Sequence, residues 1–174
     1  MAVAGRSNVG KSSLLNALSG QRDLARTSKT PGRTRCLNFF AVGNSLALVD
    51  LPGYGYASMG RADAARIGAL MRDYLRNRAN LSALVMLVDA RRGPEREEAE
   101  LSKVFGRADL QLIIVATKSD KLRRSERAAA LERFKVLGFE PTLCSAADGE
   151  GIEELGRRIL EIATRGRGRR ADRG

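Results

Sequence analysis

Short apolar runs alternate with amphipathic stretches along most of the chain. Such alternation is typical of a three-layer α/β/α domain, with a mostly parallel sheet between two layers of helices. Gly43-Asn44 separates two of the runs, so these two strands are expected to form a hairpin with one antiparallel strand. The six predicted strands are Met1–Ala4, Cys36–Val42, Leu46–Asp50, Leu84–Asp89, Leu110–Thr117 and Pro141–Cys144.

Two further stretches repeat apolar residues at the spacing of one helix face. Both stripes are expected to face the core: Ile67, Leu70, Met71 and Tyr74 in the first, and Ile152, Leu155, Ile159 and Ile162 in the second. Residues 165–174 instead interleave arginine with glycine, a composition typical of disorder. We therefore predict one folded domain over 1–164 and a basic, disordered tail over 165–174.

The composition narrows the class of protein. A length of 174 residues and a hydrophobic content of 43% suit a single domain with its own core. The absence of histidine excludes an imidazole base and a histidine-ligated metal. Cys36 and Cys144 lack the spacing of a zinc site or a disulfide framework, so both are interpreted as core residues in a reducing cytosol.

The net charge and the length of the longest apolar stretch indicate which partners and which cellular location to expect. The net charge of +11 and the sequence pI of about 10.6 indicate a polyanionic partner, with solvated helix faces as the alternative. The longest nearly apolar stretch, Leu81–Val88, is much shorter than the roughly 20 residues of a membrane-spanning helix. Since the N-terminus carries no signal-like segment, we expect a cytoplasmic chain with no membrane partner.

One segment near the N-terminus fits the pattern G-x-x-x-x-G-K-[ST] of a phosphate-binding P-loop. It follows an apolar run and opens a helical pattern, which is the context that this motif requires. The glycines let successive backbone N–H groups face phosphates, the lysine reaches the β- and γ-phosphates, and the serine ligates Mg²⁺. The alternative is a chance glycine-rich turn. The residues are Gly5, Arg6, Ser7, Asn8, Val9, Gly10, Lys11 and Ser12.

The third predicted strand ends in the pattern D-x-x-G, formed by Asp50, Leu51, Pro52 and Gly53. This position carries Asp50 to the carboxyl edge of the sheet, where ligands of open α/β folds bind. Asp50 can hold Mg²⁺ through water, and Gly53 can bring its N–H close to a γ-phosphate because it has no Cβ. An ordinary turn could also have the D-x-x-G pattern. Its position after the P-loop in the chain favours the functional interpretation.

A later polar segment is expected to determine which nucleotide base is bound. Thr117, Lys118, Ser119 and Asp120 directly follow the fifth predicted strand. The carboxylate of Asp120 can accept hydrogen bonds from the N1–H and the exocyclic amine of guanine, which adenine lacks. Lys118 can lay its aliphatic stem over the ring. After the sixth strand, Ser145 and Ala146 can place a backbone N–H near the guanine O6.

The polar loop Thr27–Thr34 lies between the P-loop and Asp50 and could fold over a γ-phosphate. A threonine here is expected to complete the Mg²⁺ shell, and spacing alone leaves Thr30 and Thr34 both open. Without a P-loop in the chain, an ordinary surface loop would be the first interpretation.

Together these segments resemble the translation-factor-related P-loop GTPases, and more narrowly the EngB/YsxC/YihA family of bacterial ribosome-biogenesis GTPases. The narrower resemblance covers nearly the whole chain and rests on Gly5–Ser13, Lys29–Thr34, Asp50–Ala57 and Thr117–Lys121. The strand before the P-loop is shorter than in similar proteins, which predicts a truncated chain or a misassigned start.

The resemblance implies a monomeric GDP/GTP switch in assembly of the large ribosomal subunit, with links to cell division and septation. It also implies nucleotide contacts from the loop before the second strand, with Thr34 as the Mg²⁺-binding and catalytic threonine beside Lys11 and Gly53. The residues that it assigns to this loop are Gly32, Arg33, Thr34, Arg35 and Cys36.

Tyr54 stands where Ras-like GTPases carry a water-orienting glutamine, so slow intrinsic hydrolysis is expected. Related GTPases with asparagine at the position of Asn8 can use K⁺ to neutralise charge. We therefore hypothesise that Asn8 helps to hold K⁺; equal turnover in K⁺ and Na⁺ buffers would contradict this. The basic surface is expected to dock on rRNA phosphates without reading bases, because the few aromatic residues form no stacking array.

Two alternatives have other functions. A nucleotide-binding scaffold without meaningful turnover is compatible with Tyr54, and single-turnover measurements with ribosomal particles would separate it from a switch. A small-molecule kinase shares the P-loop, but the guanine-selecting segment Thr117–Asp120 disfavours it.

Overall fold

The computed structural model describes residues 1–21, 24–25, 37–42, 46–55, 60–104 and 110–171. Its strands form a six-stranded sheet in the order β2-β3-β1-β4-β5-β6. The strands β2 and β3 pair antiparallel, and the other neighbours pair parallel. The bounds are β1 (Ala2–Gly5), β2 (Asn38–Val42), β3 (Leu46–Asp50), β4 (Ala83–Asp89), β5 (Gln111–Thr117) and β6 (Pro141–Cys144).

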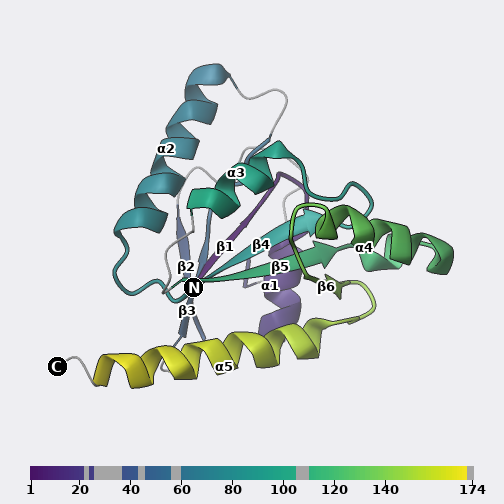
Figure 1. The fold of residues 1–174 in the computed structure, drawn as a ribbon. Helices are drawn as coiled ribbons and strands as arrows, with labels where there is room; N and C mark the ends of the chain where they lie inside the picture. Colours follow the sequence, from purple (N-terminus) through teal and green to yellow (C-terminus); the bar gives the residue numbers. More distant parts are fainter. Residues whose placement is uncertain (22–23, 26–36, 43–45, 56–59, 105–109, 172–174) are drawn as a thin grey trace.

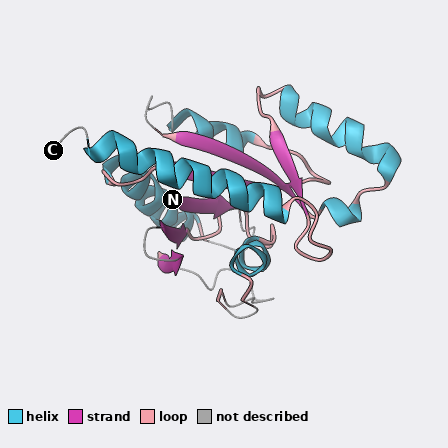
Figure 2. Ribbon diagram, turned by 90° about the horizontal axis from the view of Figure 1, so that it is seen from below, coloured by secondary structure: helices cyan, strands magenta, loops and turns pink. Residues whose placement is uncertain are grey.

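Helices cover both faces of this sheet (Figure 1). One apolar cluster joins α1 and α5 to one face, and a second joins α2, α3 and α4 to the other. In Figure 2 the long helix α5 lies across its face of the sheet. The helices are α1 (Lys11–Ser19), α2 (Arg61–Asn77), α3 (Arg96–Val104), α4 (Arg127–Lys135) and α5 (Ile152–Ala171), with short 3₁₀ turns at Ser119–Lys121 and Arg124–Glu126.

The central strands are apolar on both faces because each face carries helices. Every residue of β4 is buried. Val85 and Leu87 belong to the cluster with α1 and α5, whereas Leu84 and Met86 belong to the opposite cluster. Adjacent strand residues point to opposite faces, so a continuous apolar run is what a doubly covered strand requires.

The predicted α/β/α architecture is confirmed. The third and sixth strands have their predicted bounds, and β2 pairs antiparallel with β3 in the register Asn38↔Asp50 to Val42↔Leu46. The turn residues of that hairpin, 43–45, lie outside the described residues. Cys144 is buried as expected, and Cys36 belongs to the undescribed segment.

Two expectations about helices differ from the structure. Leu70 was expected in the core, but it is 38% exposed, whereas Ile67, Met71 and Leu75 are buried. The buried stripe therefore runs through positions four residues apart, and Leu70 falls at its solvent edge. The backbone of α5 continues as helix to Ala171, through most of the segment predicted to be disordered. Arginine is a good helix former, so the segment can extend a helix that the core has already nucleated.

The parallel strands end at one edge of the sheet, and the predicted motifs follow them there. The P-loop follows β1, D-x-x-G ends β3, and the segment that begins at Thr117 ends β5. Open α/β sheets bind ligands at this edge. Within the described ranges, no helix has both the length and the apolar character needed to cross a membrane.

Candidate functional site

The loop between β1 and α1 has the backbone of an anion-binding turn. Asn8 and Gly10 both have positive φ angles, of 62° and 99°. Gly5 is packed so closely that an added Cβ would lie 2.8 Å from Val9 Cγ1. The first amides of α1 carry the positive end of the helix dipole, so this loop presents N–H groups and partial positive charge to one place.

Lys11 and Asp50 meet at the centre of the site. The ammonium of Lys11, at the first position of α1, forms a short ion pair with Asp50 Oδ1 at the end of β3. Both side chains are nearly buried, at 10% and 5% exposure. The predicted phosphate-binding cation and the predicted metal-binding carboxylate therefore lie in direct contact.

The D-x-x-G segment rests on the P-loop. A Cβ on Gly53 would lie 3.1 Å from Ser7 Oγ and 3.3 Å from the Ser7 backbone nitrogen. The Ser7 N–H donates to the carbonyl of Tyr54 at 2.9 Å. A side chain at position 53 would have to displace the loop by a few tenths of an ångström, so glycine suits this close approach of the D-x-x-G segment to the predicted phosphate-binding loop.

The segment after β5 is bonded to the same loop. The buried hydroxyl of Thr117 donates to the Val9 carbonyl at 2.7 Å. Lys118, which has a φ of 60°, stretches across Gly10 and donates to the Asn8 carbonyl at 2.6 Å. These two bonds connect the predicted base-binding segment to the predicted phosphate-binding loop across more than a hundred residues.

Asp120 is held as an ionised acceptor. Lys121 lies 3.0 Å from Asp120 Oδ2, and the hydroxyl of Ser145 donates to Oδ1 at 3.0 Å. The hydrogen bond from Lys121 has the largest effect and, together with that from Ser145, lowers the pKa of the Asp120 carboxyl. The carboxylate therefore keeps its charge at neutral pH and can accept hydrogen bonds from a base edge.

A cavity of about 260 Å³ opens beside this carboxylate; we call it the Asp120 cavity. It connects the start of α1 with the loops after β5 and β6, so one molecule can contact both the P-loop and Asp120. Its lining residues are Val9, Gly10, Ser13, Leu14, Thr117, Lys118, Asp120, Lys121, Cys144, Ala146 and Ala147.

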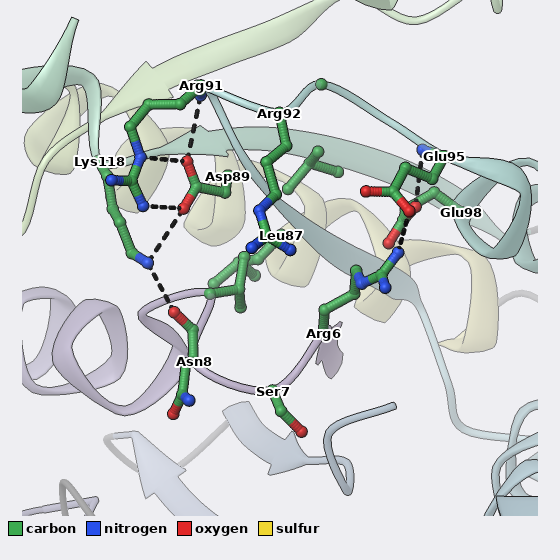
Figure 3. Close-up of a pocket in the computed structure, with 13 residues that line it drawn as sticks. Arg6, Ser7, Asn8, Leu87, Asp89, Arg91, Arg92, Glu95, Glu98 and Lys118 are labelled. Carbon is green, nitrogen blue, oxygen red and sulfur yellow. Dashed lines mark hydrogen bonds and ion pairs between the residues drawn. The ribbon is translucent and has the colours of Figure 1, made fainter. Parts of the chain in front are cut away.

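Some residues of the site were not found from the sequence. Asp89, at the end of β4, accepts two hydrogen bonds from the Arg91 guanidinium, at 2.9 and 2.7 Å, and pairs with Lys118 at 3.0 Å (Figure 3). Burial opposes ionisation, but the hydrogen bonds from Arg91 and Lys118 lower the pKa of Asp89 to about 2. Its position at a strand end, like that of Asp50, was the available signal.

Glu150 is a second such residue. The hydroxyl of the fully buried Ser119 donates to Glu150 at 2.5 Å, and Arg127 pairs with the same carboxylate. Ser119 therefore supports the loop that carries Asp120, with its side chain directed toward Glu150. Nothing in the local sequence pattern connects residues 119, 127 and 150.

The predicted loop residues Gly32, Arg33, Thr34, Arg35 and Cys36, and the alternative Thr30, lie outside the described residues. Two predicted Mg²⁺ ligands remain among the residues that the structure describes: Asp50, which pairs with Lys11, and Ser12, which follows Lys11 in α1. Hydroxyl and carboxylate oxygens suit Mg²⁺, which in nucleotide sites needs only one or two protein carboxylates beside phosphate oxygens and water. This donor set fits the ion.

Fold and site together define the class of P-loop GTPases. A family model described as 50S ribosome-binding GTPase matches residues 1–118. A probable GTP-binding protein EngB from Streptococcus equi subsp. zooepidemicus is 43% identical over 167 residues, covering 92% of this chain and 83% of the relative. Its counterpart from Lactobacillus gasseri is 49% identical over 133 residues, covering 76% and 69%. The chain belongs to the 50S ribosome-binding GTPase family, among its EngB-type members.

Solved structures agree with this assignment. The crystal structure of a probable GTP-binding protein engB superposes with a TM-score of 0.74 at 28% identity, covering 94% of this chain and 98% of that one. Era from Aquifex aeolicus, bound to GDP and AlF₄⁻, superposes with a TM-score of 0.72 at 23% identity, covering 93% and 56%. The Era likeness shows the fold alone. The predicted family and GTPase class are therefore confirmed.

Proposed function

We propose that this GTPase works as a GDP/GTP switch in assembly of the large ribosomal subunit. The observation that supports guanine specificity is the carboxylate of Asp120, which accepts a hydrogen bond from Ser145 and pairs with Lys121 at the wall of a cavity that reaches the P-loop. A charged acceptor at that place discriminates guanine, which offers two N–H donors, from adenine.

The phosphates would lie along residues 5–12. Lys11 would leave Asp50 for the β- and γ-phosphates, which frees the carboxylate to act through water on Mg²⁺ held by Ser12 and, by the family resemblance, Thr34. Mg²⁺ would neutralise developing charge on the phosphate oxygens. The N–H of Gly53, next to Ser7, would face the γ-phosphate.

Hydrolysis would be slow without an activator. Tyr54 occupies the position after the D-x-x-G glycine, and its phenol cannot orient an attacking water as the glutamine of Ras-like GTPases does. Catalysis would rest on positioning and charge neutralisation by Lys11 and the loop amides. The K⁺ hypothesis for Asn8 is part of this proposal and is tested by comparing turnover in K⁺ and Na⁺ buffers.

The proposed partner is rRNA of a large-subunit precursor. The family description names the 50S ribosome, and a solved structure of Era contains Mg-GDPNP and nucleotides 1506–1542 of 16S ribosomal RNA. A net charge of +11 supplies the attraction to phosphates. A monomer acting in the cytoplasm, with links to cell division and septation, completes the proposal.

The decisive experiment measures binding of fluorescent GDP, GTP and ATP analogues with and without Mg²⁺. We expect guanine-only binding in the wild-type chain, and Asp120→Asn should weaken it or redirect it toward xanthine nucleotides. Asp73→Asn, an exposed change on α2, is the matched control and should bind as the wild type does. Equal binding of ATP would overturn the guanine assignment.

A scaffold without meaningful turnover is the competing function, because of Tyr54. Single-turnover hydrolysis with and without ribosomal particles separates the two. Acceleration by the particles supports the switch, and no turnover in either case supports the scaffold.

A further inference from the structure

A buried carboxylate lies behind the P-loop and takes no part in the proposed nucleotide contacts. Glu98, in the first turn of α3, is only 1% exposed. Its Oε1 accepts the Tyr54 hydroxyl at 3.0 Å, and its Oε2 accepts the Glu95 backbone N–H at 2.8 Å. A buried acid is costly unless it is well bonded, so these two contacts define what Glu98 holds together: the start of α3 and Tyr54.

Tyr54 connects this acid to the nucleotide site. Its carbonyl accepts the Ser7 N–H, and its backbone forms a parallel bridge with Arg6. The preceding residue, Gly53, is the proposed γ-phosphate contact. One residue therefore touches the P-loop through its backbone and α3 through its side chain.

Arg6 supplies a second connection between the same elements. Its guanidinium forms ion pairs with Glu95, at a short distance, and with Glu97 at 3.5 Å. It also covers Gly55, where an added Cβ would lie 2.8 Å from Arg6 Nε. Figure 3 shows Arg6 and Glu98 on one side of a cavity of about 260 Å³ whose other walls include Asn8 and Asp89.

We infer that Tyr54, with Glu98 and Arg6, is a positioning unit that transmits the nucleotide state from Gly53 to α3. This inference rests on the proposed switch function. Drawing the N–H of Gly53 toward a γ-phosphate displaces Gly53 and takes the adjoining Tyr54 with it. A hydrogen bond is lost when its donor–acceptor distance lengthens by more than a few tenths of an ångström, so the bond between Tyr54 and Glu98 opens. Glu98 then keeps its bond to the Glu95 N–H but loses its bond to Tyr54, so the start of α3 is held by fewer contacts in the GTP state than in the GDP state.

Hydrogen exchange of residues 95–103 tests this, with the wild-type chain bound to GDP or to a non-hydrolysable GTP analogue. We expect slower exchange with GDP. Tyr54→Phe removes only the hydroxyl, so exchange should be fast and equal in both states. The ratio of the Kd for GDP to that for the GTP analogue should rise about three- to tenfold, the range given by one hydrogen bond.

Two further variants make the result specific. Glu98→Gln tests the acid itself and should have the same effect as Tyr54→Phe. Glu100→Gln changes an exposed acid of the same helix and should preserve the wild-type difference. Thermal unfolding of each variant checks that the fold is intact.

The outcomes separate this inference from the proposed function. Normal guanine binding with equal wild-type exchange in both states overturns the inference alone, as does a Tyr54→Phe chain that keeps both the exchange difference and the Kd ratio. Failure of the wild-type chain to bind either guanine nucleotide overturns the proposed switch together with the inference.

Discussion

The functional side chains of the site depend on contacts with neighbouring side chains. Asp120 has its charge fixed by Lys121 and by the buried hydroxyl of Ser145. That hydroxyl also accepts the Ala147 N–H at 3.2 Å, so it orders the loop that lines the cavity. At the residue scale, orientation depends on such supporting contacts as much as on the motif.

Ser145→Ala should weaken GDP binding about three- to tenfold without changing the preference for guanine over adenine. The carboxylate remains in place but loses one of the bonds that orient it. Titration with fluorescent GDP and ATP analogues measures both quantities. Ser102→Ala, which removes a hydroxyl that donates to the Ala99 carbonyl of its own helix, is the control and should bind normally. A change in base preference would contradict this account.

Asp89 should make stability depend on pH in strongly acidic solution. Its pKa is about 2 in the folded chain against an ordinary value of 3.8, so its contribution is complete above pH 3.8 and is lost as the pH falls toward 2. We expect it to amount to about 1 kcal/mol after screening by water. Urea unfolding between pH 5 and pH 2 should show this loss in the wild-type chain, and Asp89→Asn should lack it. The same pH dependence of the free energy of unfolding in both chains would contradict the lowered pKa of Asp89.

The GTPase family could be predicted from the sequence because the chemistry of its motifs is local and their spacing is strict. The sequence misses Asp89 and Glu98 because each is identified by partners from other elements: Lys118 after β5 for the first, and Tyr54 after β3 for the second. A single acidic residue in an amphipathic helix looks like a solvated position until the strand beside it is known.

At the element scale, burial explains why strands are predicted better than helices. The strand β4 is covered on both faces and reads as an unbroken apolar run, so it was placed to within one residue. The stripe of α2 is ambiguous at its edge, which is why Leu70 was wrongly placed in the core. The arginine-rich end of α5 has no apolar stripe at all, so only its continuity with a packed helix accounts for its helical backbone.

Phe134 is the main anchor of α4. It is fully buried in the cluster with α2 and β4, so Phe134→Ala should lower the free energy of unfolding by about 3–5 kcal/mol. Val136 directly follows α4 and is 84% exposed. Val136→Ala should therefore change the free energy of unfolding by less than about 0.5 kcal/mol. Chemical denaturation of both variants measures the difference. Similar losses would mean that α4 is packed differently.

At the scale of the whole molecule, the net charge of +11 governs association with polyanions. Binding to rRNA fragments should weaken steeply as salt rises, because each neutralised phosphate releases counterions. Fluorescence titrations across a range of KCl concentrations give the slope of log K against log salt. The slope should be the same for rRNA fragments of different sequence. Affinity that is independent of salt would contradict electrostatic docking.

The bonds from Thr117 to Val9 and from Lys118 to Asn8 span more than a hundred residues of chain. Closing loops of that length is entropically unfavourable, so these contacts form only once β1, β4 and β5 have paired. No early intermediate of folding can therefore offer the nucleotide its complete site. Guanine nucleotide therefore binds the fully folded chain in preference to partly folded forms, and its binding stabilises the completed fold.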